Sequence, residues 1–351
     1  MIDNWVRLPC PNPSAQDAAV AEARQNQLTK PRGALGLLEK VAINLAALQS
    51  TERPSADRVR IVVFAGDHGV TAQGVSAYPA AVTVEMLRNF VRGGAAISVL
   101  AREIGAPLEV IDVGTRASEP ITGVTTDKPR CGTRDFSLEA AMTAEEVAAS
   151  LTSGRRAVER AATAGADILI LGEMGIGNTT SATAIAAALL ALPPSALTGA
   201  GTGLDDVGIR HKANVVARAV RRHGLLEGNA DPLDVLVRVG GFEIAALTGA
   251  LIASAQAKVP VLVDGFIVSV AALLAVRLNP SCRPWLLFSH RSSETGHQHV
   301  LSALSAEPLL DLKMRLGEGS GAALVLPVIR LACALHNQMA TFEEASVSDA
   351  M

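Results

Sequence analysis

The chain has 351 residues and a mass of 36.3 kDa, which allows one large domain or two modest ones. Hydrophobic residues make up 49%, charged residues 19% and aromatic residues 3%, and the net charge is −3. This composition excludes a disordered chain, because there is enough apolar surface to build a core. Few aromatic rings and no net positive charge argue against binding to nucleic acid or to an anionic membrane.

The N-terminal part predicts helices before any strand. Ser14 is expected to cap a helix that runs through Ala18 to about Gln27, and Pro31 and Gly33 then interrupt the pattern. Apolar residues recur at helical spacing over residues 35–48. We expect these helices to form a separate helical unit or to pack on a partner.

Six short apolar runs follow, each ending in glycine or a small polar residue and each leading into a helical segment. Continuous apolar runs that alternate with helices predict a parallel sheet covered on both faces. The runs are Val59–Ala65, Leu108–Ile111, Ile168–Leu171, Val235–Val239, Val259–Val263 and Trp285–Phe288.

The C-terminal stretch from Leu309 to Phe342 is helical in pattern, with a kink expected at Pro327. It is expected to return to the N-terminal helices. The longest apolar stretch, Val259–Val276, contains Pro260 and Asp264 and predicts a buried strand and helix, not a membrane span.

Cysteine usage and the N-terminus bear on the cellular compartment. The four cysteines are widely spread and form no C-x-x-C pair, which favours reduced thiols over disulfides or zinc. Met1–Pro13 has no apolar core of a signal peptide. We therefore expect a cytoplasmic protein.

The segment Gly172–Thr180 is a glycine-rich turn between a strand and an Ala-rich helix. Glycines allow close backbone approach, and a helix N-terminus offers free N–H groups, so this turn suits a phosphate. It is not a P-loop, because Asn178 stands where lysine is needed. The alternative is a tight turn with no ligand.

A second glycine-rich segment, Thr198–Asp206, is followed by Lys212. Two such loops with one lysine suit a nucleoside monophosphate better than a triphosphate. The alternative is a flexible connector that caps the next helix at Asp205 or Asp206.

Glu318 lies between glycines in Gly317–Gly321. The glycines let the backbone bring this carboxylate close to a ligand, and burial would raise its pKa toward that of a general base. The alternative is an exposed loop glutamate.

Two further segments allow weaker hypotheses. A metal site is one hypothesis, with Asp67, His68, His290, His297 and His299 as ligands. His297 and His299 are two positions apart, however, and on a helix such side chains point in different directions. In Val75–Pro79 and the following helix, Tyr78 and Met86 could hold a flat apolar ligand, or could simply belong to the core.

Taken together in chain order, these segments resemble the nicotinate-nucleotide–dimethylbenzimidazole phosphoribosyltransferase family of cobalamin biosynthesis. Each motif alone is weak, but the ordered set spans about residues 30–340. The matching segments are Lys30–Gly36, Ala65–Val70, Gly172–Thr180, Gly201–Asp206, Val263–Phe266, Ser289–Glu294 and Arg315–Gly321.

The resemblance implies that phosphoribose passes from nicotinate mononucleotide to 5,6-dimethylbenzimidazole, giving α-ribazole 5′-phosphate and nicotinate, with no cofactor and no metal. It implies an α/β fold with a parallel six-stranded Rossmann-like sheet flanked by helices. It also implies a small helical domain from both chain ends, which we place at residues 1–55 with 325–351, and a large substrate-binding domain at 56–324. Family members are homodimers with the active site near the subunit interface.

By resemblance, Glu318 is the catalytic base. The residues expected to bind the nucleotide and its phosphate are Gly175, Gly177, Asn178, Thr179, Gly201, Gly203, Lys212, Asp264, Ser289 and Ser292. Those expected to bind the base are Ser76, Tyr78, Glu85, Met86 and Leu316. Two residues depart from the family pattern, since arginine is expected at Ala200 and glutamine at Glu85.

Two other functions compete with this one. The first is a metal-dependent hydrolase that uses Asp67, His68 and the later histidines. The second is a non-catalytic nucleotide-binding regulator that has kept the fold.

Overall fold

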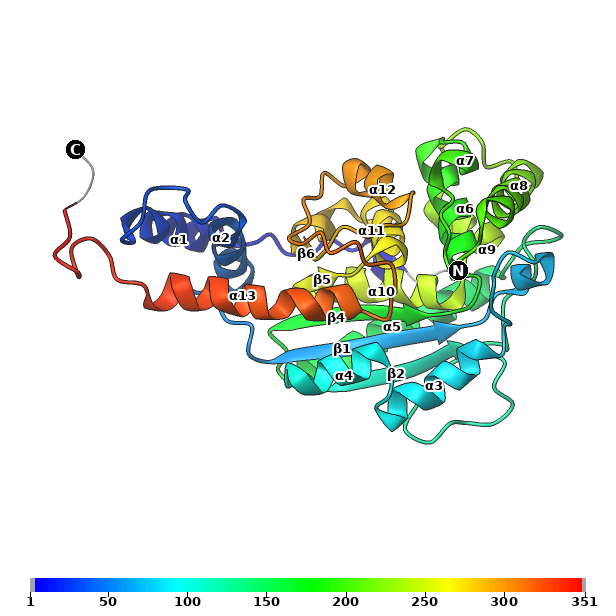
Figure 1. The fold of residues 1–351 in the computed structure, drawn as a ribbon, viewed down its shortest axis with the longest axis horizontal. Helices are drawn as coiled ribbons and strands as arrows, with labels where there is room; N and C mark the ends of the chain where they lie inside the picture. The colour runs from blue at the N-terminus through cyan, green and yellow to red at the C-terminus, as the bar shows by residue number, and fades with distance from the viewer. Residues whose placement is uncertain (1–3, 349–351) are drawn as a thin grey trace.

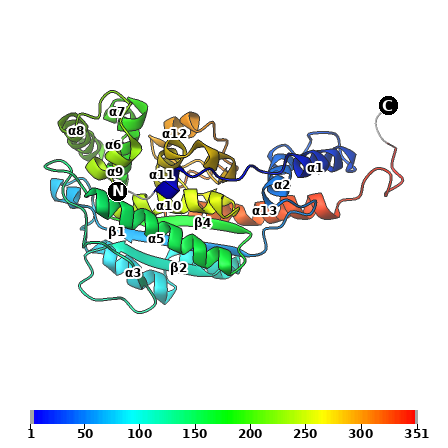
Figure 2. The same ribbon diagram turned by 180° about the vertical axis from the view of Figure 1, so that it is seen from behind.

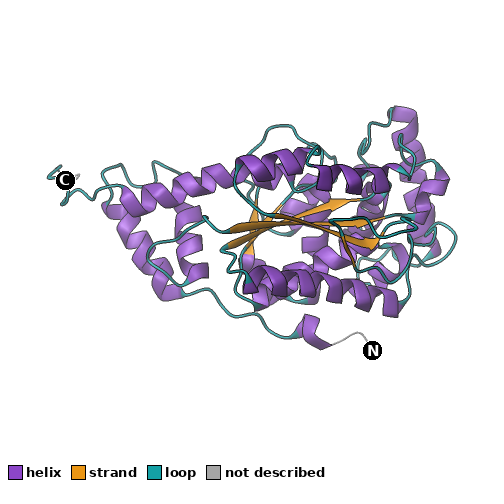
Figure 3. Ribbon diagram, turned by 90° about the horizontal axis from the view of Figure 1, so that it is seen from below, coloured by secondary structure: helices purple, strands orange, loops and turns teal. Residues whose placement is uncertain are grey.

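The computed structural model describes residues 4–348, and a parallel sheet lies at its centre (Figures 1 and 3). Within these residues the sheet has six strands in the order β3-β2-β1-β4-β5-β6, and every neighbouring pair is parallel. This confirms the predicted α/β class with a parallel six-stranded sheet, and the strand order is that of a Rossmann-like fold. The strands are β1 Val59–Gly66, β2 Leu108–Gly114, β3 Thr125–Thr126, β4 Ile168–Met174, β5 Val261–Val263 and β6 Leu286–Phe288.

Helices cover both faces of the sheet. Helices α5, α10 and α11 pack on one face, and α3, α4 and the first half of α13 pack on the other (Figures 1 and 2). The helices are α1 Ala15–Gln27, α2 Leu37–Gln49, α3 Val82–Arg92, α4 Ala96–Glu103, α5 Ala144–Thr163, α6 Asn178–Leu190, α7 Pro194–Leu197, α8 Asp206–Arg222, α9 Pro232–Val239, α10 Phe242–Gln256, α11 Phe266–Leu278, α12 His297–Ala303 and α13 Ser320–Gln338.

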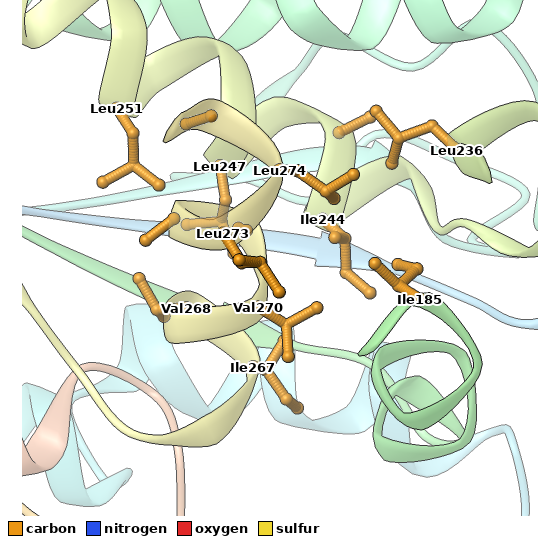
Figure 4. Close-up of a cluster of buried hydrophobic side chains, with 14 of the residues drawn as sticks. Ile185, Leu236, Ile244, Leu247, Leu251, Ile267, Val268, Val270, Leu273 and Leu274 are labelled. Carbon is orange, nitrogen blue, oxygen red and sulfur yellow. The ribbon is translucent and has the colours of Figure 1, made fainter. Parts of the chain in front are cut away.

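Two hydrophobic cores follow from the alternation of side chains along the strands. In β1, Val62 and Phe64 point into one core, and Ile61 and Val63 point into the other. The larger core is filled by aliphatic side chains of α6, α9, α10 and α11 (Figure 4). Both sheet faces are therefore dry, which explains the continuous apolar runs in the sequence.

One of the six predicted strands is wrong. Val235–Val239 belongs to helix α9, where Pro232 occupies the first turn and the Asp231 side chain accepts a hydrogen bond from the Leu233 N–H. A short apolar run can be a buried helix or a buried strand, and these two helix-start signals decide for the helix. The sixth strand is instead the two-residue β3 at the edge of the sheet.

The C-terminal helical prediction is too long. Helix α13 begins only at Ser320, and residues 309–319 are non-helical, with Leu310 bridged to His290 beside β6. Pro327 lies inside the helix. As predicted, α13 returns to the N-terminal helices, because it packs against α2 and Arg24 donates a hydrogen bond to the His336 carbonyl at 2.7 Å.

Helices α1 and α2 and the end of α13 form a helical unit at one end of the molecule (Figures 1 and 2). Ser14 caps α1 as predicted, since its side chain accepts a hydrogen bond from the Asp17 N–H. Because α13 starts at the sheet and ends in this unit, the expected boundary at residue 325 falls within a continuous helix.

In residues 4–348, α13 alone is long and apolar enough to cross a membrane by length and composition. Just over half of its most apolar window is buried, and a core helix passes the same test, so this is weak support for a span. The stretch Val259–Val276 forms the expected buried strand and helix, β5 and α11.

Candidate functional site

A cavity of about 450 Å³ opens at the carboxyl edge of the sheet, the edge at which open α/β sheets bind ligands. Its floor is the end of β4, and its walls come from α3, the loop before α8, the turn after β5 and the segment before α13. Ten of the sixteen predicted site residues line it: Tyr78, Met86, Gly175, Asn178, Thr179, Gly201, Asp264, Ser292, Leu316 and Glu318.

The other six predicted residues lie outside the lining. Lys212 and Ser76 stand directly behind it, bonded to the lining residues Thr179 and Thr202. Ser289 is buried and donates a hydrogen bond to the Val263 carbonyl, which places it in the support of the sheet edge. The remaining three are Gly177 at the start of α6, Gly203 in the loop before α8, and Glu85, which is exposed on α3 beside Met86.

Glu318 sits on an unusual turn at the cavity. Gly317, Glu318 and Gly319 have φ angles of +88°, +65° and +84°, and for glutamate this left-handed conformation is disfavoured. The side chain is only 6% exposed, and its Oε2 accepts a hydrogen bond from the Ile97 N–H at 3.2 Å, in the first turn of α4. Burial raises the pKa of Glu318, partly opposed by the Ile97 N–H and reinforced by the charge of Asp264.

Asp264 holds this turn in place. Its two oxygens accept hydrogen bonds from the Gly319 N–H at 3.2 Å and the Ala322 N–H at 3.0 Å, at the start of α13. The His290 ring also approaches it at 3.4 Å. Asp264 lines the cavity, but its oxygens are already engaged, so its observed contacts are those of a positioning residue for Glu318.

Glu173 is a second buried carboxyl group, at the end of β4. Its carboxylate accepts a hydrogen bond from the Asn178 side-chain amide and packs against Gly317. Burial, together with the neighbouring carboxylates Glu243, Asp264 and Glu318, raises the pKa of Glu173 to about 8. At neutral pH this group is therefore mainly protonated, unlike an ordinary glutamate.

Lys212 supplies a buried positive charge behind the turn that was predicted to bind a phosphate. It is 1% exposed, and its Nζ donates to Thr179 Oγ1 at 2.7 Å and to the Gly199 carbonyl at 3.4 Å. Burial lowers the pKa of Lys212 to about 8, partly opposed by the charge of Glu294. A buried ammonium without a full counter-ion favours an incoming anion such as phosphate.

The outer part of the cavity is apolar. Tyr78 and Leu316 are each 56% exposed at its rim, and Val82, Met86 and Phe266 extend this surface inward. The cavity thus has a polar end near Lys212, an apolar end near Tyr78 and carboxyl groups on its floor, which suits a molecule with an anionic part and a flat apolar part.

Several lining residues were not predicted as site residues, among them Glu173, Thr202, His290, Glu294 and Arg315. Glu173, Thr202 and Glu294 lie inside recognised motifs, so their position just after strands or between glycines was an available signal. Arg315 was recognised only as the first residue of the Glu318 motif, although it donates to the Gly201 carbonyl at 2.7 Å.

The histidines have individual partners. His68 is hydrogen-bonded to Glu243 at 2.7 Å, His297 to Ser269 at 3.0 Å, and His299 is exposed on the other side of α12. In the part of the chain that the structure describes, no three His, Cys, Asp or Glu residues are grouped to hold a metal ion. The metal-dependent hydrolase therefore has no ligand set there.

Comparison with known proteins gives matches along nearly the whole chain. A family model described as a phosphoribosyltransferase matches residues 10–347. The nicotinate-nucleotide–dimethylbenzimidazole phosphoribosyltransferases of Bradyrhizobium sp. BTAi1 and Pseudomonas aeruginosa PAO1 are 63% and 60% identical, with 99% and 98% of both chains covered. The crystal structure of this enzyme from Thermus thermophilus is 46% identical, covers 96% of this chain and 100% of its own, and superposes with a TM-score of 0.90.

The glycine-rich turns, the buried Glu318 and the two-ended cavity agree with these matches in sequence and in fold. The chain therefore belongs to the nicotinate-nucleotide–dimethylbenzimidazole phosphoribosyltransferase family.

Proposed function

We propose that this chain transfers phosphoribose from nicotinate mononucleotide to 5,6-dimethylbenzimidazole, with Glu318 as the general base. The products are α-ribazole 5′-phosphate and nicotinate, and the configuration at the anomeric carbon is inverted. The observation that carries the proposal is the buried carboxylate of Glu318 between the polar and apolar ends of one cavity.

The bond changes require only one base. A ring nitrogen of dimethylbenzimidazole donates its electron pair to the anomeric carbon, while the bond to the pyridinium nitrogen breaks and its pair stays on that nitrogen. The leaving group departs without needing a proton, because it starts as a cation. Glu318 accepts the proton that the other ring nitrogen sheds, and the raised pKa of Glu318 makes it a stronger base than an exposed glutamate.

The two ends of the cavity then take the two substrates. Lys212, Thr179 and the turn with Gly175 and Asn178 would hold the phosphate and ribose. Gly201 lies next to Thr179 and Lys212, and Ser292 is a further residue of the lining. Tyr78, Met86 and Leu316 would pack on the flat faces of the benzimidazole. These walls would be supported by Gly177, Gly203, Ser289 and Ser76. Glu85, exposed on α3 beside Met86, would contact the base at the rim of the cavity.

Glu173 would serve the reaction by staying neutral. As a protonated acid beside Glu318, it adds no second negative charge that would compete for the proton of the base. This assigns different protonation states to two neighbouring carboxyl groups, as their different surroundings favour.

The direct test is Glu318→Gln, which keeps the shape and removes the basic oxygen. We expect kcat to fall by about 10²–10⁴-fold while both substrates still bind, because a general base contributes that much. The exposed carboxylate of Glu119 provides the control, and Glu119→Gln should behave like the wild type. Wild-type turnover by the Glu318 variant would refute its role as base.

Turnover itself separates the competing functions. Formation of α-ribazole phosphate by the wild-type protein excludes the non-catalytic regulator. Activity that persists after exhaustive chelation, with no metal in elemental analysis, excludes the metal-dependent hydrolase.

We also propose a cytoplasmic homodimer in which residues 1–55 with 325–351 form a small domain. A buried ion pair between Lys30 and Glu39 at 2.8 Å orders the exposed turn 31–36, which joins α1 and α2 in the helical unit at one end of the molecule (Figure 1). An exposed turn that a buried ion pair holds in one conformation supports contact with a second copy of the chain. The four free cysteines support a reducing compartment. Sedimentation that finds only monomers at micromolar concentration would contradict the dimer.

A further inference from the structure

The loop of residues 198–204, which we name the bridge loop, is held by the catalytic side of the cavity. The backbone N–H and the carbonyl of Gly201 are both hydrogen-bonded. Its N–H donates to Glu294 Oε1 at 3.1 Å, and its carbonyl accepts from Arg315 Nη1 at 2.7 Å. Arg315 lies three residues before Glu318, so these contacts tie the bridge loop to the segment that carries the proposed base.

The next residue ties the same loop to the opposite wall. Thr202 Oγ1 accepts a hydrogen bond from the Ala77 N–H at 3.0 Å and lies 3.0 Å from Ser76 Oγ. Ser76 Oγ in turn accepts from the Tyr78 N–H at 3.2 Å. One hydroxyl therefore fixes the segment that presents Tyr78 to the apolar end of the cavity.

The bridge loop also touches the polar end. Lys212 donates to the Gly199 carbonyl at 3.4 Å and to Thr179 Oγ1 at 2.7 Å. An anion that binds Lys212 and Thr179 therefore changes the hydrogen bond of Lys212 to Gly199. Gly199 lies two positions before Gly201 and three before Thr202. The path from the polar end to the apolar wall is thus a few bonds of backbone and one side-chain hydroxyl.

We propose that Thr202 is a positioning residue that couples binding at the polar end of the cavity to binding at the apolar end. This rests on the proposed function, which assigns phosphoribose to the polar end and the benzimidazole to the apolar end. A donor that orders the bridge loop orders the Ser76–Tyr78 segment through Thr202, so the acceptor then meets a preformed wall. By linkage, the acceptor strengthens donor binding by the same factor.

Calorimetry with a donor mimic that has no leaving base tests this coupling without turnover. Dimethylbenzimidazole is titrated into the wild-type protein with and without saturating ribose 5-phosphate, and ribose 5-phosphate is titrated with and without dimethylbenzimidazole. We expect each affinity to rise about 5-fold or more when the other ligand is present, at the low end of typical coupling between sites.

Three variants separate coupling from a merely structural effect. Thr202→Val keeps the shape but removes the acceptor for the Ala77 N–H, and its coupling factor should fall below about 2-fold. Thr202→Ser keeps the hydroxyl and should restore it. Thr163→Val, which removes an exposed hydroxyl bonded within α5, should leave it unchanged. A structural defect would weaken the binding of both ligands equally and leave the coupling factor unchanged.

The outcomes distinguish this inference from the function on which it rests. Coupling in the wild type that Thr202→Val retains would overturn the role of Thr202, as would a wild-type protein without coupling. Turnover of nicotinate mononucleotide and dimethylbenzimidazole is measured separately, and a wild type that turns over without coupling refutes this inference alone. A wild type without turnover refutes the proposed function.

Discussion

Two glycine-rich segments border the cavity, and the atoms that surround their glycines differ. At the end of β4 and in the turn that follows it, other parts of the chain occupy the space of a side chain. A Cβ on Gly172 would lie 2.6 Å from the Gly319 nitrogen and closer still to the Glu318 carbonyl, and one on Gly177 would lie 2.7 Å from the Thr71 side chain. In the bridge loop, the nearest atoms to a Cβ are side-chain ends, those of Glu294 at Gly199 and of Thr179 at Gly201, where the distance is 2.8 Å. A Cβ on Gly203 would meet nothing within 4 Å, but its φ is +104°.

The difference indicates which loop is fixed and which can move. The first loop is locked between the sheet and the Glu318 turn by backbone packing, so it is a rigid floor for the substrate. The bridge loop is held by side chains that reach it from Glu294, Arg315 and Ser76. Such contacts can open and close at low cost, which suits a wall that must admit two substrates.

Among changes to the two glycine-rich segments, Gly172→Ala should have the largest effect, because it breaks the rigid floor. The new methyl group overlaps backbone that cannot move independently, and we expect a loss of about 3 kcal/mol of stability. Because Glu318 is displaced, kcat should also fall about 100-fold, as expected for a misplacement of about 1 Å. Urea unfolding and steady-state kinetics measure the two effects.

Gly208→Ala is the matched control for this substitution. Gly208 lies in the first turn of α8, where its new Cβ meets only side-chain atoms, Leu204 Cδ2 at 3.0 Å and Leu204 Cβ at 3.1 Å, and the change should cost much less than Gly172→Ala. If Gly172→Ala matched this control in stability and kcat, the floor would not be rigid.

Lys212→Met tests the residue that joins the two loops. Removing a charged hydrogen-bond donor, which contributes about 1.5–3 kcal/mol, should raise the KM for nicotinate mononucleotide by roughly 10–100-fold. The effect on kcat should be smaller, because the phosphate does not react. Lys258→Met, at an exposed lysine after α10, is the control and should keep the wild-type KM.

The pH dependence sharpens this prediction. Because the pKa of Lys212 is lowered to about 8, the free enzyme loses this positive charge as the pH rises through 8. In the wild type, kcat/KM for the mononucleotide should therefore fall above pH 8, since this ratio reports the ionisation of the free enzyme. The Met variant should lose the part of this fall that comes from Lys212, and the fall that remains belongs to Glu173, whose pKa is also about 8. An identical profile in both proteins would remove Lys212 from phosphate binding.

The sequence was sufficient where a local pattern determines the structure. The glycine motifs around Gly172 and Glu318 predicted a turn and a carboxylate at the cavity, because both depend on neighbouring residues. Val235–Val239 was wrongly predicted as a strand, because its apolar run is ambiguous by itself. β3 was missed because two threonines at a sheet edge carry no periodicity.

The contacts of the bridge loop lay beyond sequence reasoning for another reason. Glu294 and Arg315 reach Gly201 from 93 and 114 residues away, and Ser76 reaches Thr202 from 126 residues away. No spacing rule relates positions so far apart, so the loop's role in joining the walls is visible only in three dimensions. The sequence indicated Lys212 as a candidate, but it did not predict that this lysine is buried between the two loops.

Gly203→Ala should have the smallest effect and completes the comparison. The added methyl group has open space, so the cost is only the backbone strain of an L-residue at φ +104°, about 1–2 kcal/mol. The loop can relieve this strain by shifting, and kcat/KM should fall by less than about tenfold, which corresponds to about 1.4 kcal/mol. The same two assays used for Gly172→Ala measure it. If Gly203→Ala were as damaging as Gly172→Ala, the bridge loop would be as rigid as the floor, and the distinction between a fixed and a mobile wall would fail.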